Sequence, residues 1–450
     1  MVQTVALVSS SSLDQLPELD EDDRPSTPLR PCDFADWKDV FDTVPNHHDL
    51  ILERGDYRAW GKCVIDQANP SDRRRIIRFT DTAKPWDRIN NEAVTDGFQF
   101  TSGAAYWAVH GLTIRGPNLA TCYAKRGAEH ITFDSLLIED IDTHGIQLAG
   151  NHCTVQNCVI RRASPHDAAA VLIRVDGEPP VGNRVLDNEI CDCIDGVGVT
   201  WWNEPGGDPY MECRDLVVEG NDIYLTEGRY VHRPEPAFPP NPNPPRAHAT
   251  AENAIDIKAG PRTSTEPLRF VRNRIWGFRA PEPGSAQESD GAAVTIHRGA
   301  QRILFDHNVI FDCPIAFHEV VRDKADPNKG HREMTVRSNI VSFMHPYNPE
   351  DLGAILRTKL LFHLEGNRFS HSRTLSAFPK KPDTHDVFVN NVLHDDTPLG
   401  EASYDWTHPA TNNNRIPPAG DMSDILIERC RWTNPGLVRL RSAVLSSDVF

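Results

Sequence analysis

Short segments with apolar side chains at alternate positions recur along the chain and predict β-strands. In each five-residue segment the second and fourth positions are apolar, while the third and fifth are mostly polar or charged. Because successive side chains of a strand point to opposite faces, we expect the apolar pairs to point inward. These pairs are Ile146/Leu148, Val171/Ile173, Val199/Trp201, Ile255/Ile257, Val294/Ile296 and Ile315/Phe317.

A second pattern, an Asn followed two residues later by an aliphatic residue or Phe, sets the period of the chain. Most intervals between successive copies are 24 to 35 residues, which is typical of a solenoid with insertions. An Asn at a sharp bend tolerates the left-handed backbone conformation, and its amide can bond to the same amide in the next coil. The copies begin at Asn157, Asn188, Asn221, Asn273, Asn308, Asn339, Asn367 and Asn391.

Short strands at this period predict an all-β fold, a right-handed single-stranded parallel β-helix. A β-propeller needs blades of about 40–50 residues, and a helical bundle needs apolar spacing of about 3.6 residues. Residues 33–41 read as a short amphipathic helix that caps the first coil. We expect a weakly ordered leader over residues 1–30, the β-helix domain over 31–400 and a C-terminal tail over 401–450 that packs on the last coils.

Charge and hydropathy exclude two classes of partner. The formal net charge of −17 argues against nucleic-acid binding, and no stretch has the roughly 18 consecutive apolar residues of a membrane span. The ten cysteines lack metal-type spacing, so we expect buried thiols. The N-terminus lacks the basic segment and long apolar run of a secretory signal. We therefore expect a cytoplasmic protein, or a secreted or periplasmic one whose leader is absent.

The outward positions of the five-residue segments gather cationic and aromatic side chains on one line. Neighbouring strands lie about 4.8 Å apart, so the fifth positions of successive segments form a continuous column. A solvated face mixes acidic, Ser and Thr side chains, whereas this column predicts a groove for a ligand. The column contains, in order, Ala149, Arg174, Trp202, Lys258, His297 and His318.

Each of these side chains also has a plainer structural interpretation. Lys258 can form a surface ion pair with Asp256, and such pairs contribute little to stability. Trp202 can simply pack between coils, and a lone His is more often structural. Stacked beside cations, however, His297 and His318 are better placed to titrate, and an exposed Trp is a common platform for a sugar ring.

Three stretches resemble the pectate-lyase-like β-helix superfamily: residues 252–258, the Asn273-Arg-Ile unit and residues 290–298. More narrowly, they are similar to the alginate lyase and chondroitinase B group, in which a Lys ends one strand and an Arg ends the strand of the next coil. The resemblance in fold covers roughly residues 50–400, and the resemblance in site covers only about 250–300.

The resemblance implies roles for five residues. Lys258 matches the catalytic base, and Arg298, or His297 before it, matches the second catalytic residue. Glu252 and Asp256 fall near the positions that hold a calcium ion in that group, although their spacing differs from the closely paired acids found there. Ca²⁺ is therefore the cofactor that the resemblance implies.

β-Elimination of a uronate requires a base for the C5 proton, a cation for the carboxylate and an acid for the leaving oxygen. Lys258 can be the base if cationic neighbours lower its pKa, whereas Asp256 acts in the opposite direction. Other outward side chains would bind the substrate, Arg174 through its planar fork. The predicted substrate-binding residues are Arg174, Trp202, His318, Thr200 and Glu319.

We therefore predict a polysaccharide lyase that acts on a uronate-containing polysaccharide or oligosaccharide. A C5-epimerase would use the same proton abstraction without elimination. A glycoside hydrolase needs two carboxylic acids, which Asp256 with Glu319 or Glu252 could supply. A non-catalytic glycan-binding β-helix is the third alternative, because a fold does not determine a function.

Overall fold

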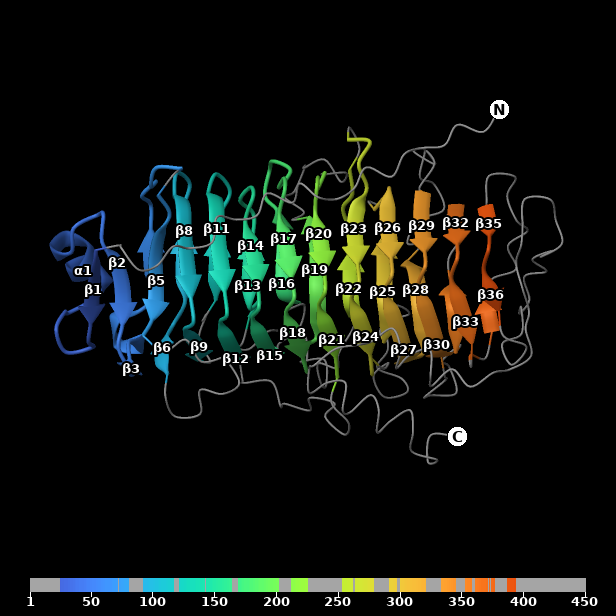
Figure 1. Ribbon diagram of the computed structural model, residues 1–450, viewed down its shortest axis with the longest axis horizontal. Helices are drawn as coiled ribbons and strands as arrows, with labels where there is room; N and C mark the ends of the chain where they lie inside the picture. The colour runs from blue at the N-terminus through green and yellow to red at the C-terminus, as the bar shows by residue number, and fades with distance from the viewer. Residues whose placement is uncertain are drawn as a thin grey trace, which may run out of the picture.

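The strands form three long sheets in which every pair of neighbours is parallel (Figure 1). Strand order within each sheet advances by three through the repeating part of the chain, so each coil contributes one strand to each sheet. This arrangement is the predicted right-handed parallel β-helix. The computed structural model describes residues 25–71, 73–80, 92–116, 121–141, 143–163, 169–201, 212–225, 253–261, 264–278, 291–297, 300–320, 333–344, 353–357, 361–370, 372, 374–376 and 387–393.

The first sheet, sheet A, has 13 strands. They are β1 (Ser26–Leu29), β2 (Asp49–Leu52), β5 (Arg75–Phe79), β8 (Ala105–His110), β11 (Glu129–Asp134), β14 (Thr154–Gln156), β17 (Arg184–Leu186), β20 (Val217–Glu219), β23 (Leu268–Val271), β26 (Ile303–Asp306), β29 (Glu333–Arg337), β32 (Leu361–Glu365) and β35 (Val387–Val389).

The second sheet, sheet B, has 12 strands. They are β3 (Gly55–Asp56), β6 (Ala93–Thr95), β9 (Thr113–Gly116), β12 (Leu137–Ile141), β15 (Val159–Ala163), β18 (Glu189–Cys191), β21 (Asp222–Tyr224), β24 (Arg274–Trp276), β27 (Val309–Cys313), β30 (Ile340–Met344), β33 (Arg368–Ser370) and β36 (Val392–Leu393).

The third sheet, sheet C, has 11 strands and carries the predicted site residues. They are β4 (Cys63–Ile65), β7 (Phe98–Phe100), β10 (Cys122–Ala124), β13 (Ile146–Leu148), β16 (Ala169–Val175), β19 (Asp195–Trp201), β22 (Asn253–Ile257), β25 (Ala292–His297), β28 (Ile315–Val320), β31 (Ala354–Arg357) and β34 (Thr374–Ser376).

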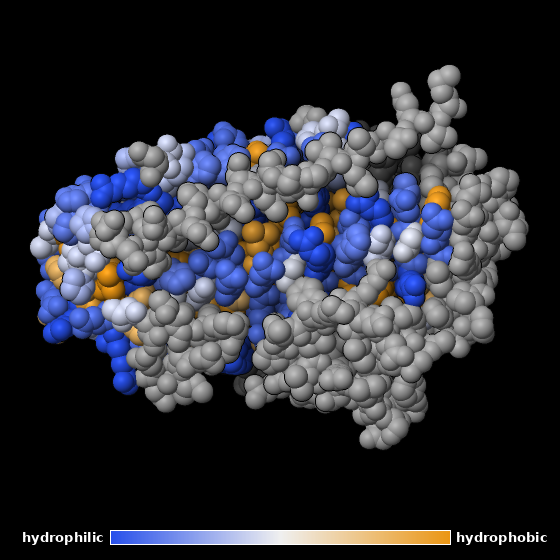
Figure 2. Space-filling view, in the orientation of Figure 1, coloured by the Kyte–Doolittle hydropathy of each residue, from blue (hydrophilic) through white to orange (hydrophobic). Residues whose placement is uncertain are grey.

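The core consists of inward columns of branched side chains, one residue from each coil. Such side chains are stiff and pack well on a pleated surface. Among the described residues Val64 is the one large hydrophobic side chain that is exposed, and the surface in Figure 2 is mainly hydrophilic where it is described. In sheet B the inward column is Ile138, Ile160, Ile190, Ile223, Ile275 and Ile310, each at most 1% exposed.

A helix covers the N-terminal end of the solenoid, as predicted, but it begins and ends later than the pattern indicated (Figure 1). Helix α1 (Trp37–Thr43) begins after Asp36, whose carboxylate accepts a hydrogen bond of 2.9 Å from the amide of Asp39. This N-cap fixes the start of the helix. The buried ring of Trp37 lies 5.1 Å from that of Trp60, which ends the 3₁₀ helix η1 (Arg58–Trp60).

The predicted leader ends earlier than residue 30. Strand β1 pairs in parallel with β2, and Leu29 is fully buried, so residues 26–29 are the first strand of the solenoid. Residues 1–24 and the predicted tail over 401–450 lie outside the described residues. No helix in the described part of the chain is long and apolar enough to span a membrane.

The repeated Asn residues form a hydrogen-bonded ladder between sheets A and B. Each side-chain amide donates to the side-chain oxygen of the next Asn at 2.9–3.0 Å, and each is at most 2% exposed. The predicted amide ladder is therefore confirmed. Its members are Asn188, Asn221, Asn273, Asn308, Asn339, Asn367 and Asn391.

The prediction that these Asn residues adopt the left-handed conformation is wrong. That conformation belongs to the residue before each ladder Asn, as at Asp187, where φ is 52°. Asn157 is itself such a preceding residue, with φ 53°, and the next residue, Cys158, takes the ladder position by donating its amide to Asn188 at 2.9 Å. The other preceding residues are Gly220, Arg272, His307, Ser338, Gly366 and Asn390.

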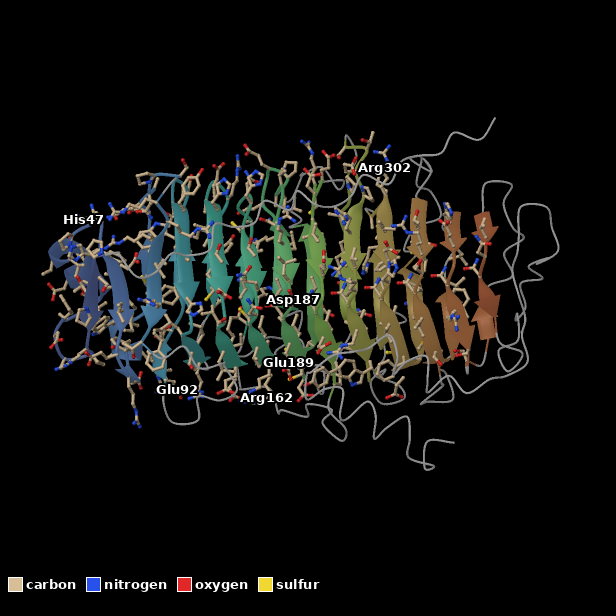
Figure 3. The ribbon with its side chains drawn as sticks, viewed as in Figure 1. His47, Glu92, Arg162, Asp187, Glu189 and Arg302 are labelled. Carbon is tan, nitrogen blue, oxygen red and sulfur yellow. The ribbon has the colours of Figure 1, made fainter. Side chains whose placement is uncertain are left out.

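The outer face of sheet B carries acidic and basic side chains that form ion pairs with one another. Figure 3 labels two of these residues, Glu92 and Arg162. Glu139 is 3% exposed and accepts hydrogen bonds from Arg161 at 2.7 Å and Arg162 at 2.8 Å. Arg115 bridges Glu139 and Glu92. Burial raises the pKa of Glu139, but its arginine partners outweigh burial and leave the pKa below the usual value. These charges are structural.

Candidate functional site

The backbone register of sheet C differs by two residues from the predicted alignment between β16 and β19. Val171 pairs with Val197, not Val199, so Thr200 and not Trp202 stands beside Arg174. The two-residue shift keeps the inward and outward alternation, because the segment offers Val at both inward positions. Trp202 itself lies outside the described residues.

A second two-residue shift separates the prediction from the structure between β25 and β28. Val294 pairs with Phe317, so His318 lies beside Thr295 rather than His297. Glu319 pairs with Ile296, which belongs to the inward column, and is only 7% exposed. The structure therefore does not present Glu319 with the outward side chains, since it alternates with His318 along the strand.

Three predicted residues meet at the ends of β22 and β25, and we call them the Asp256 cluster: Asp256, Lys258 and His297. Lys258 Nζ lies 2.6 Å from Asp256 Oδ2, and His297 Nε2 lies 2.8 Å from Asp256 Oδ1. The register explains the contact, because Ile257 pairs with Ile296 and so places Lys258 next to His297. One carboxylate therefore holds an ammonium group and an imidazole side by side.

The three side chains of the Asp256 cluster differ in their exposure to solvent. The Asp256 side chain is 3% exposed, whereas those of His297 and Lys258 are 18% and 35% exposed. Burial raises the pKa of Asp256, but the charges and hydrogen bonds of His297 and Lys258 outweigh burial and lower it to about 2. Asp256 is therefore ionised at neutral pH, and the groups that a ligand meets first are a cation and an imidazole.

Three further residues support the strand that carries Asp256, and the sequence pattern did not single them out. Thr295 pairs with Asp256 in the register and donates a hydrogen bond of 2.6 Å to Asn253 Oδ1. The backbone N–H of Asn253 in turn donates a hydrogen bond of 3.0 Å to Asp195 Oδ1. All three are buried. The signal that could have found Asp195 and Asn253 is a polar residue at the start of a strand in successive coils.

A second group of outward side chains lies towards the N-terminus on the same sheet, and we call it the Arg174 cluster: Tyr123, Gln147 and Arg174. Arg174 Cζ lies 5.7 Å from the centre of the Tyr123 ring, and Arg174 Nη1 donates to Gln147 Oε1 at 3.3 Å. Of these residues only Arg174 was predicted as a ligand-binding side chain.

The remaining predicted residues occupy different places. Thr200 continues the column between Arg174 and Lys258, since its backbone pairs with Arg174 and the amide of Lys258 donates to Val199 O. His318 is 3% exposed and lies one strand beyond Thr295, on the far side from Asp256. Arg298 and Glu252 lie outside the described residues.

The described residues around Asp256 do not suit a calcium ion. Ca²⁺ takes six to eight oxygen ligands, usually several carboxylates. Each oxygen of Asp256 already lies within 2.8 Å of a nitrogen of Lys258 or His297. Within the described parts of the chain no three His, Cys, Asp or Glu residues are grouped as metal ligands. The calcium expectation remains a prediction that depends on Glu252.

Comparisons with known proteins return solved structures of similar backbone. No protein-family model matches the chain, and no curated protein matches it significantly. An alginate lyase from Paenibacillus sp. str. FPU-7 is 15% identical, over 70% of this chain and 95% of its own, with a TM-score of 0.47. Pectate lyase Pel9A is 14% identical, over 71% of this chain and 76% of its own, with a TM-score of 0.46.

A third solved structure spans nearly the whole of both chains. It is a mannuronic acid specific polysaccharide family 6 lyase from human gut microbiota, 12% identical over 94% of this chain and 99% of its own, with a TM-score of 0.46. At such identities the likeness concerns the course of the backbone and assigns no role to any residue. The parallel β-helix is defined by the three sheets themselves.

Proposed function

We propose that this protein is a carbohydrate-active enzyme, a polysaccharide lyase that cleaves a uronate-containing glycan by β-elimination. The observation that carries the proposal is the Asp256 cluster, in which one buried carboxylate holds Lys258 and His297 together at the outer face of sheet C. A cation and a proton acceptor side by side are what proton abstraction next to a carboxylate requires.

Lys258 is better suited to bind the substrate carboxylate than to take its proton. Asp256 Oδ2, 2.6 Å from Lys258 Nζ, stabilises the ammonium form of the lysine. An ammonium group placed at the uronate carboxylate stabilises the negative charge that develops when the neighbouring C5–H bond breaks. The lysine assigned as the base by resemblance therefore acts, in this proposal, as the electrostatic group.

His297 is the group that takes the C5 proton. Imidazole is the side chain most suited to exchange a proton near neutral pH, and Asp256 orients the ring through its contact with Nε2. The electron pair of the C5–H bond forms the C4–C5 double bond, and the C4–O bond breaks. The leaving oxygen then takes a proton from the protonated His297 or from Lys258, which balances the reaction.

Hydrolysis has less support from the same residues. It needs two carboxylic acids across the scissile bond. Along the two outward columns from β13 to β28, Asp256 is the one acidic residue, and its two oxygens contact nitrogens of Lys258 and His297. The columns read Gln147, Leu172, Gly198, Asp256, Thr295 and His318, and Ala149, Arg174, Thr200, Lys258, His297 and Val320.

The test is ultraviolet absorbance of the unsaturated uronate product during incubation with alginate, pectate, glucuronan and glycosaminoglycan oligomers, with and without Ca²⁺. We expect a rising signal with at least one of these glycans and a loss of at least about 100-fold in Lys258→Ala, the usual scale for removing an electrostatic or acid–base group. Arg269→Ala is the matched control, because Arg269 is an exposed cation on sheet A.

Three other results would contradict the proposal. New reducing ends without absorbance would indicate hydrolysis. Exchange of the C5 proton without a double bond would indicate an epimerase. Absence of any product from the whole panel, with binding retained, would indicate a non-catalytic glycan-binding protein.

A further inference from the structure

The Arg174 cluster has the composition of an anion-binding subsite. Its three side chains come from three successive coils, Tyr123 from β10, Gln147 from β13 and Arg174 from β16. The guanidinium lies over the Tyr123 ring, 5.7 Å from its centre, and donates to Gln147 Oε1 at 3.3 Å. An arginine held in this way has lost part of its conformational freedom before any ligand binds.

The surroundings of Arg174 favour an anion over a neutral group. Burial raises the pKa of the Tyr123 hydroxyl, so the ring stays uncharged, and Lys125 Nζ lies 6.0 Å from the centre of the same ring. Among the described residues here, the outward positions at the ends of β10 and β16 carry two cations, Lys125 and Arg174, against one carboxylate, Asp176, whose charge also acts on the Tyr123 hydroxyl. Two cations against one carboxylate is a positive excess in a chain whose net charge is −17.

The backbone register places this subsite at a defined distance from the Asp256 cluster. Arg174 and Lys258 stand in the same outward column with Thr200 between them. Two strand spacings separate their backbones, which amounts to about 10 Å along the axis of the solenoid. A sugar unit in an extended polysaccharide is about as long as one strand spacing. The two cations are therefore roughly two sugar units apart.

We propose that Arg174 binds a second carboxylate of the same glycan chain whose reacting carboxylate is held by Lys258. Tyr123 and Gln147 are positioning residues that hold the guanidinium. The inference rests on the proposed function for the Asp256 cluster and makes it more specific. The substrate lies along the axis of the solenoid and carries carboxylates about two units apart, as a polyuronate does.

The experiment measures binding without turnover, in a His297→Ala background that keeps Lys258. Calorimetry with galacturonate, mannuronate and guluronate oligomers of two to six units gives affinity as a function of length. For the preferred polymer we expect Arg174→Ala to weaken binding of four or more units by about 10- to 100-fold, the range for a charge-assisted hydrogen bond. Binding of the dimer should not change, and Arg269→Ala should leave every length unchanged.

The affinity for long oligomers also tests whether Tyr123 and Gln147 position the Arg174 guanidinium. Tyr123→Leu and Gln147→Leu should each weaken binding of long oligomers several-fold, whereas Tyr123→Phe should retain the affinity because it keeps the ring. Arg174→Lys should recover only part of the affinity, since an ammonium group lacks the planar fork. Thermal unfolding of each variant separates a loss of binding from a loss of fold.

The outcomes of the binding experiment and of the lyase assay are separable. Unsaturated product from wild-type protein, with equal affinity of Arg174→Ala and its parent at every length, would overturn this inference and leave the lyase proposal intact. Length-dependent loss of binding without unsaturated product would overturn the lyase proposal alone. Absence of binding to any polyuronate, or equal binding of uncharged glycans, would overturn the inference.

Discussion

The Asn ladder and the outer face of sheet C are both built by stacking one position from each coil. They differ in whether the same residue occupies that position in every coil. In the ladder every step is the same bond between identical amides, at 2.9–3.0 Å from Asn188 to Asn391. On sheet C the neighbouring side chains differ from coil to coil, as with Asp256, Thr295 and His318.

The difference separates residues that maintain the solenoid from residues that are free to do chemistry. A ladder amide is satisfied by its copy in the next coil, so its loss leaves buried polar groups without partners. An outward position on sheet C needs only to fit a strand, because the inward columns already supply the core. Side chains can therefore differ there from coil to coil, and the Asp256 cluster uses that freedom.

The largest expected effect separates the role of Lys258 from that of His297 in the Asp256 cluster. We expect Lys258→Arg to keep at least about a tenth of wild-type turnover, because arginine retains the charge, whereas His297→Ala should lose about 10²- to 10⁴-fold, as for a general base. Initial rates of unsaturated product measure both. Turnover of Lys258→Arg as low as that of Lys258→Ala would instead identify Lys258 as the base.

The next largest effect is on stability and belongs to the ladder. Asn273 donates to Val218 O and to Asn308, accepts from Asn221 and is fully buried. Asn273→Ala should lower the free energy of unfolding by about 2–5 kcal/mol, since several buried partners lose their bonds. Asn157→Ala is the matched control, because Asn157 is exposed and outside the ladder. Chemical denaturation of both variants gives the difference.

Equal destabilisation by Asn157→Ala and Asn273→Ala would show that the ladder contributes no more than an ordinary turn residue. We expect about 1 kcal/mol for Asn157→Ala, the cost of placing alanine in the left-handed conformation. Turnover per folded molecule should stay unchanged in both variants.

A smaller, pH-dependent effect links the Asp256 cluster to stability. The folded pKa of Asp256, about 2, lies below the ordinary value near 3.9, so its ionised form stabilises the folded protein. That contribution, about 2 kcal/mol, is present above pH ~4 and is lost as the pH falls through about 2. Denaturation of wild type and Asp256→Asn at a series of pH values should show the gap closing over this range.

A gap between wild type and Asp256→Asn that stays constant from pH 6 to pH 2 would contradict this account of Asp256. The contacts with Lys258 and His297 would then contribute nothing to stability. Glu139→Gln serves as a comparison, because its arginine partners also lower its pKa but belong to the structural face of sheet B.

The sequence was sufficient to predict the fold because the solenoid repeats its signals. The alternation of apolar residues predicted which side chains point inward, and the spacing of Asn221, Asn273 and Asn308 predicted the repeating coils. The left-handed conformation was assigned one residue too late. It is a property of the bend that precedes the ladder, and residues as different as Gly220, Arg272 and Ser338 occupy that position.

The placement of the candidate site residues along sheet C was predicted in part, and the errors have a physical cause. Lys258 and His297 were aligned correctly because β22 and β25 carry one unambiguous pair of inward residues each. The shifts at Trp202 and His318 arose because a slip of two residues leaves every side chain on its predicted face, so periodicity alone does not detect it. Tyr123 and Gln147 were missed since their roles depend on neighbouring coils.

The most direct test of the central claim compares Lys258→Ala with Asn273→Ala under conditions in which both are folded, by the initial rate of unsaturated uronate formation per folded molecule. We expect a rate at least about 100-fold below wild type for Lys258→Ala and an unchanged rate for Asn273→Ala. Equal rates in the two variants, or no unsaturated product from the wild-type protein, would contradict the assignment of lyase chemistry to sheet C.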